Sequence, residues 1–484
     1  MMIGWMFLHV FFVLVLGYYF ITALQWYSYK IERVLFHYSR YDWHLYFFVI
    51  PVLAYYFLNY FYELGKFYFA GYLVLLLLPT LYLWYKKLDK KLVFTARVKR
   101  FFAFLMLATL FQDFLCIATE KCFVFGVLLP LIFSYLASLL FEKILFESYK
   151  KEALRKLNSN KNMKIIAITA SYGKTSIKNF LYEVLSKKYR VYKTPRSVNT
   201  LGGVVKDIND NLEDNLDFYI VEAGARQSGD IDEIAGFLNH HIAIVGEIGE
   251  QHIEYFKTLQ NIRDTKMELL NSKRLEIAFV SKSTNVKPND KVIIYDSKEL
   301  DIKATLDGVE FSMPLNGKKE KFKTTLLGSF NAANLQVVIL TALHVNMSLE
   351  EIKKAIEKIS PVKHRLQKIE AGGKIIIDDS FNGNLQGMLD SYNLASEYKG
   401  RKVIITPGIV ESDKESNIKL AKKINSVFDL VIITGKTNQK ILDTYITKPE
   451  KILLKEKSNI EDILKEYTFE GDLILFSNDA PTYM

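Results

Sequence analysis

Five long apolar segments in the first 142 residues constrain the fold of this chain more than any other feature. Each is about 20 residues long, the length at which a helix crosses a bilayer. One such segment could be a signal peptide, but five in succession predict an all-α transmembrane region of about five helices. The predicted spans are residues 3–24, 43–62, 67–85, 101–119 and 123–141.

Basic residues between these segments predict the orientation. Residues 25–42 and 86–100 together hold ten Lys and Arg, whereas each of the two intervening loops holds one lysine. Basic loops stay in the cytoplasm, so we expect the N-terminus outside and everything after Glu142 in the cytoplasm. About half of the net charge of +10 lies in this region. Lipid headgroups explain that charge, and no basic, aromatic-rich face predicts binding to nucleic acid.

Asp113 lies inside the fourth predicted span. An acid within a membrane is a candidate functional residue, but one near the outer interface costs little. We favour the interfacial position because the sequence offers no second buried charge as a partner.

From residue 163 onward, strand-like apolar runs alternate with helical patterns, which is typical of parallel sheets flanked by helices. A second series of such runs begins near Lys374. After the transmembrane region (1–142) we predict a linker helix (143–162), an α/β central domain (163–360) and a Rossmann-like C-terminal domain (361–484). Pro361 marks the predicted boundary, because the residue before a proline avoids the helical conformation.

A phosphate-binding turn follows the first strand of the central domain. The sequence Gly173-Lys174-Thr175 stands between an apolar strand and a helix start. Such a turn points backbone N–H groups and the positive end of a helix dipole at an anion. Lys174 can neutralise the β- and γ-phosphates, and the Thr175 hydroxyl can bind Mg²⁺. Ala170 replaces the first glycine of the standard motif, and the turn predicts the use of ATP.

Further motifs follow the turn in a fixed order. They are residues 199–203, 221–231, 249–254, 263–269, 328–334, 364–365, 378–384 and 406–411. With the turn, they resemble the Mur ligases of peptidoglycan synthesis over about residues 163–484, and most closely the MurF branch. That branch adds D-Ala-D-Ala to UDP-MurNAc-tripeptide, using ATP and Mg²⁺ and passing through an acyl phosphate. The resemblance implies a cell-wall enzyme of the bacterial inner membrane, working with other proteins of cell-wall synthesis.

The resemblance also assigns roles to individual residues. Lys174, Lys266, Arg365 and His252 would be catalytic, with Arg365 on the γ-phosphate. ATP would contact Ser171, Gly173, Lys174, Thr175, Ser176, Asn331, Arg365 and Asp379. Thr175 and Glu222 would bind one Mg²⁺, and His252 with a carbamate on Lys266 a second. Asn199, Ser380, Asn382 and Asn384 would face the substrate.

The chain departs from the family pattern at several points. Phe330, Phe381 and Leu385 stand where His, Tyr and Pro are usual. A typical MurF begins with a soluble domain that holds UDP, and we find none before the first strand. The other domains or the membrane region would then hold UDP, or the substrate would be lipid-linked.

Two other functions stay open. One is a Mur-family ligase with another acceptor, such as a lipid-linked peptide or a folate-type polyglutamate. The other is an inactive membrane scaffold with this fold. Motifs 378–384 and 406–411 favour the MurF branch, and the complete set of phosphate and metal residues favours an enzyme.

Overall fold

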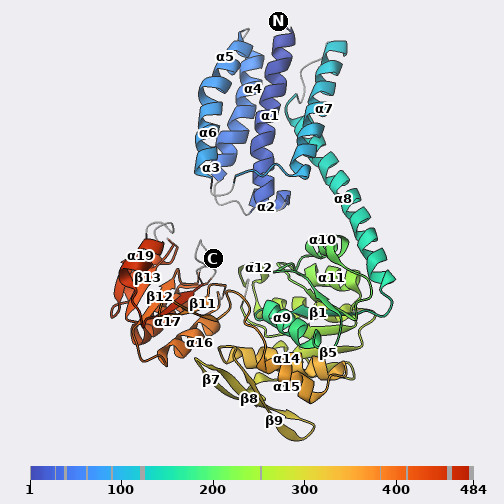
Figure 1. Cartoon of the computed structure of the whole chain (residues 1–484). Coiled ribbons are helices and arrows are strands. Elements are labelled where there is room, and N and C mark those ends of the chain that lie inside the picture. Colours follow the sequence, from blue (N-terminus) through green and yellow to red (C-terminus); the bar gives the residue numbers. More distant parts are fainter. Residues whose placement is uncertain are drawn as a thin grey trace. The chain divides into compact units, whose positions relative to one another are not determined.

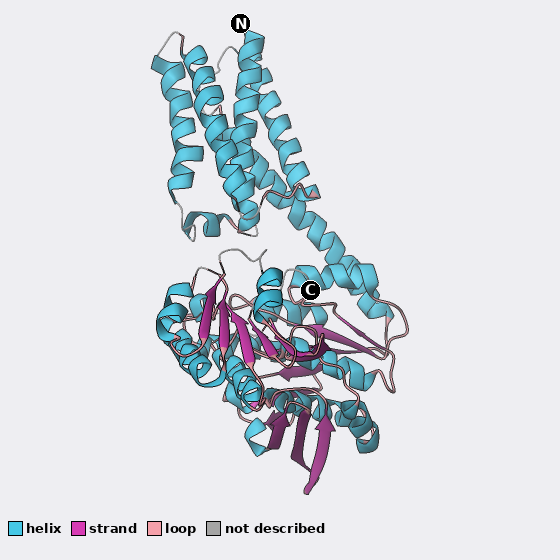
Figure 2. Cartoon of the chain, turned by 60° about the vertical axis from the view of Figure 1, so that its left-hand side comes forward, coloured by secondary structure: helices cyan, strands magenta, loops and turns pink. Residues whose placement is uncertain are grey.

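The computed structural model describes residues 2–27, 29–36, 41–61, 64–88, 91–119, 126–250, 253–381, 383–409, 412–435, 437–454 and 460–478. The chain divides into two compact units, Met1–Tyr149 and Lys150–Met484. The described part of the first unit is helical, and the second is an α/β structure (Figures 1 and 2). This confirms the predicted fold class.

The first unit is built from helical segments that follow the apolar runs of the sequence. They are α1 (Met2–Trp26), α2 (Ile31–Phe36), α3 (Tyr41–His44), η1 (Leu45–Val49), α4 (Ile50–Phe61), α5 (Gly65–Tyr72), η2 (Leu73–Leu77), α6 (Leu78–Lys87), α7 (Ala96–Thr119) and α8 (Leu128–Ser159). The segments η1 and η2 are π-helical.

Four stretches of the described chain are long and apolar enough to cross a membrane: Met6–Trp26, Gly65–Lys87, Ala96–Thr119 and Leu128–Ser159. The predicted span at 43–62 is also helical, as α3, η1 and α4, but it is not among these four. The predicted linker helix is not a separate element, because α8 continues through the last apolar run to Ser159.

Asp113 has a buried hydrogen-bonding partner, His9, which the sequence analysis did not identify. The Nδ1 of His9, on α1, lies 2.7 Å from the Asp113 carboxylate on α7, and both side chains are buried. The His9 Nε2 lies 2.5 Å from the Gly126 carbonyl oxygen, to which Gln112 also donates at 2.8 Å. The expectation of an unpartnered acid was therefore wrong. Histidine is easily overlooked because it is neutral in a simple charge count.

The described residues of the second unit form three sheets (Figure 2). The first has the order β2-β3-β1-β4-β5-β6 and is parallel throughout. Its strands are β1 (Lys164–Thr169), β2 (Val191–Lys193), β3 (Phe218–Glu222), β4 (Ile242–Val245), β5 (Ile277–Ser281) and β6 (Val292–Tyr295). In the sheet, β2 and β3 lie on one side of β1 and β4 to β6 lie on the other, so the strand order reverses at β1. In parallel α/β sheets, ligands bind at the carboxyl ends of strands beside such a switch point.

Helices α9 (Lys174–Leu185) and α14 (Phe330–His344) pack together and share one hydrophobic core with this sheet. The other elements of this part are α10 (Leu201–Asn211), α11 (Asp230–Leu238), α12 (Ile253–Phe256), α13 (Leu259–Met267), α15 (Leu349–Glu357) and three short 3₁₀ turns, η3 (Glu268–Asn271), η4 (Lys282–Thr284) and η5 (Ser297–Glu299). A small antiparallel sheet of β7 (Asp301–Thr305), β8 (Gly308–Leu315) and β9 (Lys318–Thr324) was not predicted.

The remaining sheet has the order β10-β11-β15-β12-β13-β14 and is parallel except for the edge strand β10. Its strands are β10 (Gln367–Ala371), β11 (Lys374–Asp379), β12 (Lys402–Thr406), β13 (Leu430–Ile433), β14 (Glu450–Leu453) and β15 (Leu473–Ser477). Helices α16 (Leu385–Ser396), α17 (Lys414–Val427), α18 (Gln439–Tyr445) and α19 (Ile460–Tyr467) connect them. This is the predicted Rossmann-like pattern, extended by β10.

Candidate active site

The phosphate-binding turn lies at the carboxyl end of β1. This strand pairs with β3 on one side and with β4 on the other. Gly173 has a φ of +81°, which glycine adopts without strain. A Cβ at this position would collide with the Asn334 side chain of α14. Ala170 is fully buried, and the residue facing it is Gly246, whose own Cβ would lie only 2.8 Å from the Ala170 Cβ. The missing first glycine of the motif is thus compensated by a glycine across the sheet.

Lys174 folds back over its own turn. Its Nζ donates to the carbonyl oxygens of Ala170 at 2.6 Å and Ser171 at 3.2 Å. Burial lowers the pKa of Lys174 to about 8, Glu222 opposes this shift, and the positive charge of Arg365 adds to it. An ammonium held by carbonyl oxygens at the start of a helix can move to a phosphate without a change in the backbone.

Glu222 is the last residue of β3 and is 1% exposed. The Thr175 hydroxyl donates to its two carboxylate oxygens at 3.1 and 3.3 Å, and the Asn199 amide donates at 3.4 Å. The turn and the strand end therefore bring together the two groups predicted to share one Mg²⁺. Asn199, predicted to face the substrate, also contacts this carboxylate.

Lys178 is a residue of this site that sequence reasoning missed. Its side chain is fully buried, and its Nζ lies 3.2 Å from the Glu222 Oε2 and 2.5 Å from the Arg196 carbonyl oxygen. Spacing along α9 could have revealed it, because residues four apart, such as Lys174 and Lys178, lie on the same helix face. Lys178 compensates the charge of Glu222, whose burial alone would be costly.

Lys266 lies near the end of α13 and is 3% exposed. Within the described residues, its ammonium makes no hydrogen bond or ion pair. Burial and the nearby charge of Lys174 lower the pKa of Lys266 to about 7, while Glu268, Asp230 and Glu222 act in the opposite direction. A lysine with this pKa is largely neutral at slightly alkaline pH, and only a neutral amine reacts with CO₂ to form a carbamate.

The described residues fit one magnesium ion. Mg²⁺ is commonly bound by one or two carboxylates together with substrate phosphates, and Glu222 with Thr175 stands beside the phosphate-binding turn. No group of three or more His, Cys, Asp or Glu suited to a metal occurs in the part of the chain that the structure describes. His252, predicted as a ligand of a second ion, lies outside the described residues. Lys266 would contribute an oxygen ligand only as a carbamate.

Arg365 lies just before β10. Its positive charge acts on Lys174 and Glu222. Burial lowers its pKa, against the opposing charges of Glu222 and Asp379. Its Nη1 lies 3.4 Å from the Phe381 carbonyl oxygen, a long hydrogen bond. The structure thus brings a residue of the predicted C-terminal domain into electrostatic range of Lys174 and Glu222.

The other predicted residues have local partners. Asp379 ends β11, is 1% exposed and accepts from the Leu366 backbone N–H at 3.1 Å. The Ser380 hydroxyl donates to Asp378, which also lies 2.7 Å from the His364 Nδ1. Asn384 caps α16 by accepting from the Gly387 N–H. Asn382 lies outside the described residues.

Asn331 and Ser176 are buried, so neither presents an open contact surface. The Asn331 amide donates to the Leu327 carbonyl at 2.8 Å, and its oxygen accepts from Asn334 at 3.2 Å. Its predicted contact with adenine would have to use its remaining hydrogen-bonding capacity. That contact and the role of Ser176 stay predictions.

Comparison with known proteins shows which proteins this chain resembles in sequence. Residues 168–342 match the family model of the Mur ligase middle domain. A UDP-N-acetylmuramoyl-tripeptide--D-alanyl-D-alanine ligase of Borreliella burgdorferi is 30% identical over 293 residues, covering 57% of this chain and 62% of that protein. The ligase of the same name from Bacillus subtilis is 24% identical over 335 residues, 65% of this chain and 72% of that protein. The chain thus spans less than two thirds of the Borreliella relative.

Solved structures show the same fold. MurF from Acinetobacter baumannii superposes with a TM-score of 0.61 at 20% identity, covering 69% of this chain and 78% of that one. MurF from Thermotoga maritima in complex with ADP gives 0.60 at 20% identity, with 69% and 80% coverage. Residues 168–342 of this chain are therefore similar to a Mur ligase middle domain, and its α/β unit has the fold of the solved MurF structures. In this chain, apolar helices precede that unit.

Proposed function

We propose that this protein is an ATP-dependent ligase that joins D-Ala-D-Ala to the carboxyl end of UDP-MurNAc-tripeptide. The observation that carries the proposal is that Thr175 contacts Glu222 beside Lys174. Lys266 and Arg365 lie within electrostatic range of these residues. An inactive scaffold has no use for this set beside a phosphate-binding turn: the half-buried Lys174, a buried Lys266 without an ion pair among the described residues, and a charge-compensated Glu222. The sequence relatives named as MurF ligases support the choice of substrates.

In the first step the peptide carboxylate attacks the γ-phosphorus of ATP, and the bond to the β,γ-bridging oxygen breaks. Lys174 and Arg365 would bind the transferring phosphoryl group from two sides and oppose its negative charge. Magnesium, held by Thr175 and Glu222 when bound, would neutralise the phosphates and orient them. The products of this step are ADP and an acyl phosphate.

In the second step the amine of D-Ala-D-Ala attacks the acyl carbon and phosphate leaves. Ser380, Asn382 and Asn384 lie on the segment after β11 and would position the amine. The polar pair of Ser380 and Asp378 fixes the start of this segment. We further propose that Lys266 acts as a carbamate that, with His252, binds a second magnesium ion.

We propose that the protein resides in the bacterial cell membrane as a multi-pass protein with its ligase domains in the cytoplasm. Four apolar helices support this location. Basic residues Arg97 and Arg100 stand at the start of α7, and Arg100 forms an ion pair of 2.6 Å with Glu142. Near the other end of α7, Cys116 is disulfide-bonded, a bond typical of the oxidising outer side. Both features favour a cytoplasmic N-terminal end of α7.

The test is product formation by the full-length protein in detergent. With UDP-MurNAc-tripeptide, D-Ala-D-Ala and Mg²⁺-ATP, we expect UDP-MurNAc-pentapeptide by mass spectrometry and one ADP for each product molecule. L-Ala-L-Ala serves as the control acceptor, and Lys174→Ala as the control enzyme. ATP turnover with a lipid-linked peptide or a folate, and none with these substrates, would show that the acceptor is different.

A further inference from the structure

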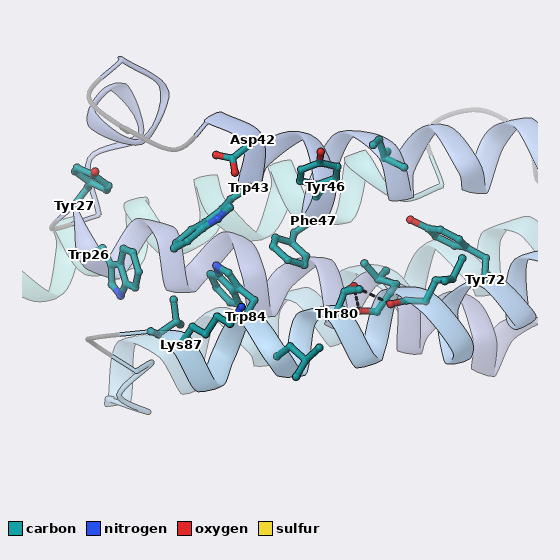
Figure 3. A pocket seen from close by; sticks show the side chains of 15 residues that line it. Trp26, Tyr27, Asp42, Trp43, Tyr46, Phe47, Tyr72, Thr80, Trp84 and Lys87 are labelled. Carbon is teal, nitrogen blue, oxygen red and sulfur yellow. Dashed lines mark hydrogen bonds between the residues drawn. The ribbon is translucent and has the colours of Figure 1, made fainter.

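A groove lies within the first unit, remote in sequence from the ligase motifs. Its volume is about 730 Å³, in the range of small-molecule sites. It runs between α3–η1–α4 on one side and η2–α6 on the other (Figure 3). Aromatic rings pack along it, with Trp43 and Trp84 perpendicular at 5.8 Å and Phe47 at 5.4 Å from Trp84. The groove is therefore a formed feature of the bundle with fixed walls.

The two π-helical segments found among the described residues of the first unit, η1 and η2, both line this groove. Tyr46 and Phe47 come from η1, and Leu76 and Leu77 come from η2. A π-helical turn inserts a residue into a helix at a cost in hydrogen-bond geometry, and such turns are found frequently at functional sites. Two of them on one groove, in separate helices, indicate that its shape serves a ligand.

The groove has a charged end and an apolar end. Asp42 and Lys87 line the end near Trp26 and Tyr27, and Tyr72 lies at the other (Figure 3). The charged end coincides with the ends of α1 and α6, next to the basic stretches that predict the cytoplasmic side. Neither Asp42 nor Lys87 forms an ion pair within the described residues, so both charges can face a ligand.

We propose that the groove binds a zwitterionic aminophospholipid of the cytoplasmic leaflet, such as phosphatidylethanolamine. The lipid phosphate would pair with Lys87, and its ammonium would pair with Asp42 and lie against the aromatic rings of Trp43 and Trp84. One acyl chain would lie along Phe47, Leu76 and Leu77. This inference depends on the proposed membrane location and not on the ligase reaction.

Charge complementarity selects this occupant. An anionic lipid without an ammonium group, such as phosphatidylglycerol, would satisfy Lys87 but place negative charge beside Asp42. A free fatty acid would do the same. The zwitterionic headgroup is the one that satisfies both side chains at the depth where Trp and Tyr commonly anchor helices.

The test is photocrosslinking of the full-length protein in liposomes of equal parts phosphatidylethanolamine and phosphatidylglycerol. A trace of either lipid carries a photoactivatable acyl chain, and labelled peptides are mapped by mass spectrometry. Thr80→Trp fills the groove. Thr119→Trp is its matched control, because both threonines are exposed and donate to the carbonyl four residues earlier, at 2.7 and 2.8 Å.

The wild type should be labelled by phosphatidylethanolamine on peptides that contain η1 and η2. Thr80→Trp should reduce this labelling about tenfold, and Thr119→Trp should not change it. Lys87→Gln should also reduce it about tenfold, the effect of losing one charge-assisted contact, whereas Lys86→Gln, whose charge lies over the Tyr82 ring, should not. Asp42→Asn should remove the preference for phosphatidylethanolamine over phosphatidylglycerol.

Equal labelling of the Thr80→Trp and Thr119→Trp variants would overturn the proposal. So would a wild type that crosslinks phosphatidylglycerol as strongly as phosphatidylethanolamine. Extraction of the same liposomes with alkaline carbonate tests the proposed membrane location separately from the proposed lipid site. Release of the protein would refute the membrane location itself, whereas retention without labelling would refute only the lipid site.

Discussion

Replacing Lys266 by methionine should stabilise the protein at neutral pH while removing its activity. The reason is that the structure buries this lysine without a partner in the described residues. Its pKa is about 7 in the folded chain and would be near 10.4 in the unfolded chain. Between these values the unfolded chain binds more protons, so the lysine costs folding free energy at pH 7. That cost disappears as the pH rises through the unfolded value.

The magnitude follows from the two pKa values. Each pH unit between them corresponds to about 1.4 kcal/mol, so the cost is about 4 kcal/mol at pH 7 and about 1 kcal/mol at pH 10. Lys266→Met has a similar length and carries no charge. It should raise the free energy of unfolding by these amounts, in CO₂-depleted buffer without nucleotide, where no carbamate or ligand adds to wild-type stability.

The assay must report on the α/β unit. All four tryptophans lie within the first 149 residues, so their fluorescence does not report its unfolding. Urea titration with brief proteolysis of the full-length protein in detergent avoids this problem. Lys422→Met, at an exposed position of α17, is the control and should leave the urea midpoint unchanged at both pH values. A Lys266→Met protein less stable than the wild type at pH 7 would refute the reasoning.

Three further substitutions test the site. Lys174→Ala should lower kcat by several orders of magnitude, because a positioned cation on the phosphates is worth several kcal/mol of barrier. Near-normal turnover would remove Lys174 from the site. Lys178→Met removes the ion-pair partner of the buried Glu222 and should destabilise the α/β unit by about 3 kcal/mol. An unchanged urea midpoint would contradict the pairing. Arg365→Ala should reduce kcat about a thousandfold, and a change confined to the KM for ATP would assign Arg365 to ground-state binding.

Much of the α/β fold could be predicted because its strands are buried on both faces and therefore read as continuous apolar runs. The apolar runs expected from residue 163 and from near Lys374 correspond to the two mainly parallel sheets. The sheet β7–β9 was missed because its strands are partly exposed and rich in lysine, as in Lys318–Thr324. Such strands lack the apolar signal by which the others were found.

The proximity of Thr175 and Glu222 beside Lys174 could be predicted from residue types and their order along the chain, while their roles stay predictions. Partnerships across the fold were not predictable. Lys178 reads as one of many helix lysines until β3 places Glu222 beside it, and His9 lies 104 residues before its partner Asp113. Burial and long-range proximity decide both pairings, and neither has a local sequence signature.

The most direct test of the central claim follows one oxygen atom. The terminal carboxylate of UDP-MurNAc-tripeptide is labelled with ¹⁸O, and the inorganic phosphate released during ligation is analysed by mass spectrometry. If the carboxylate is phosphorylated by ATP and the amine then expels phosphate, each product molecule should be accompanied by one phosphate that carries ¹⁸O. Phosphate without label, formed while the amide product accumulates, would contradict the account.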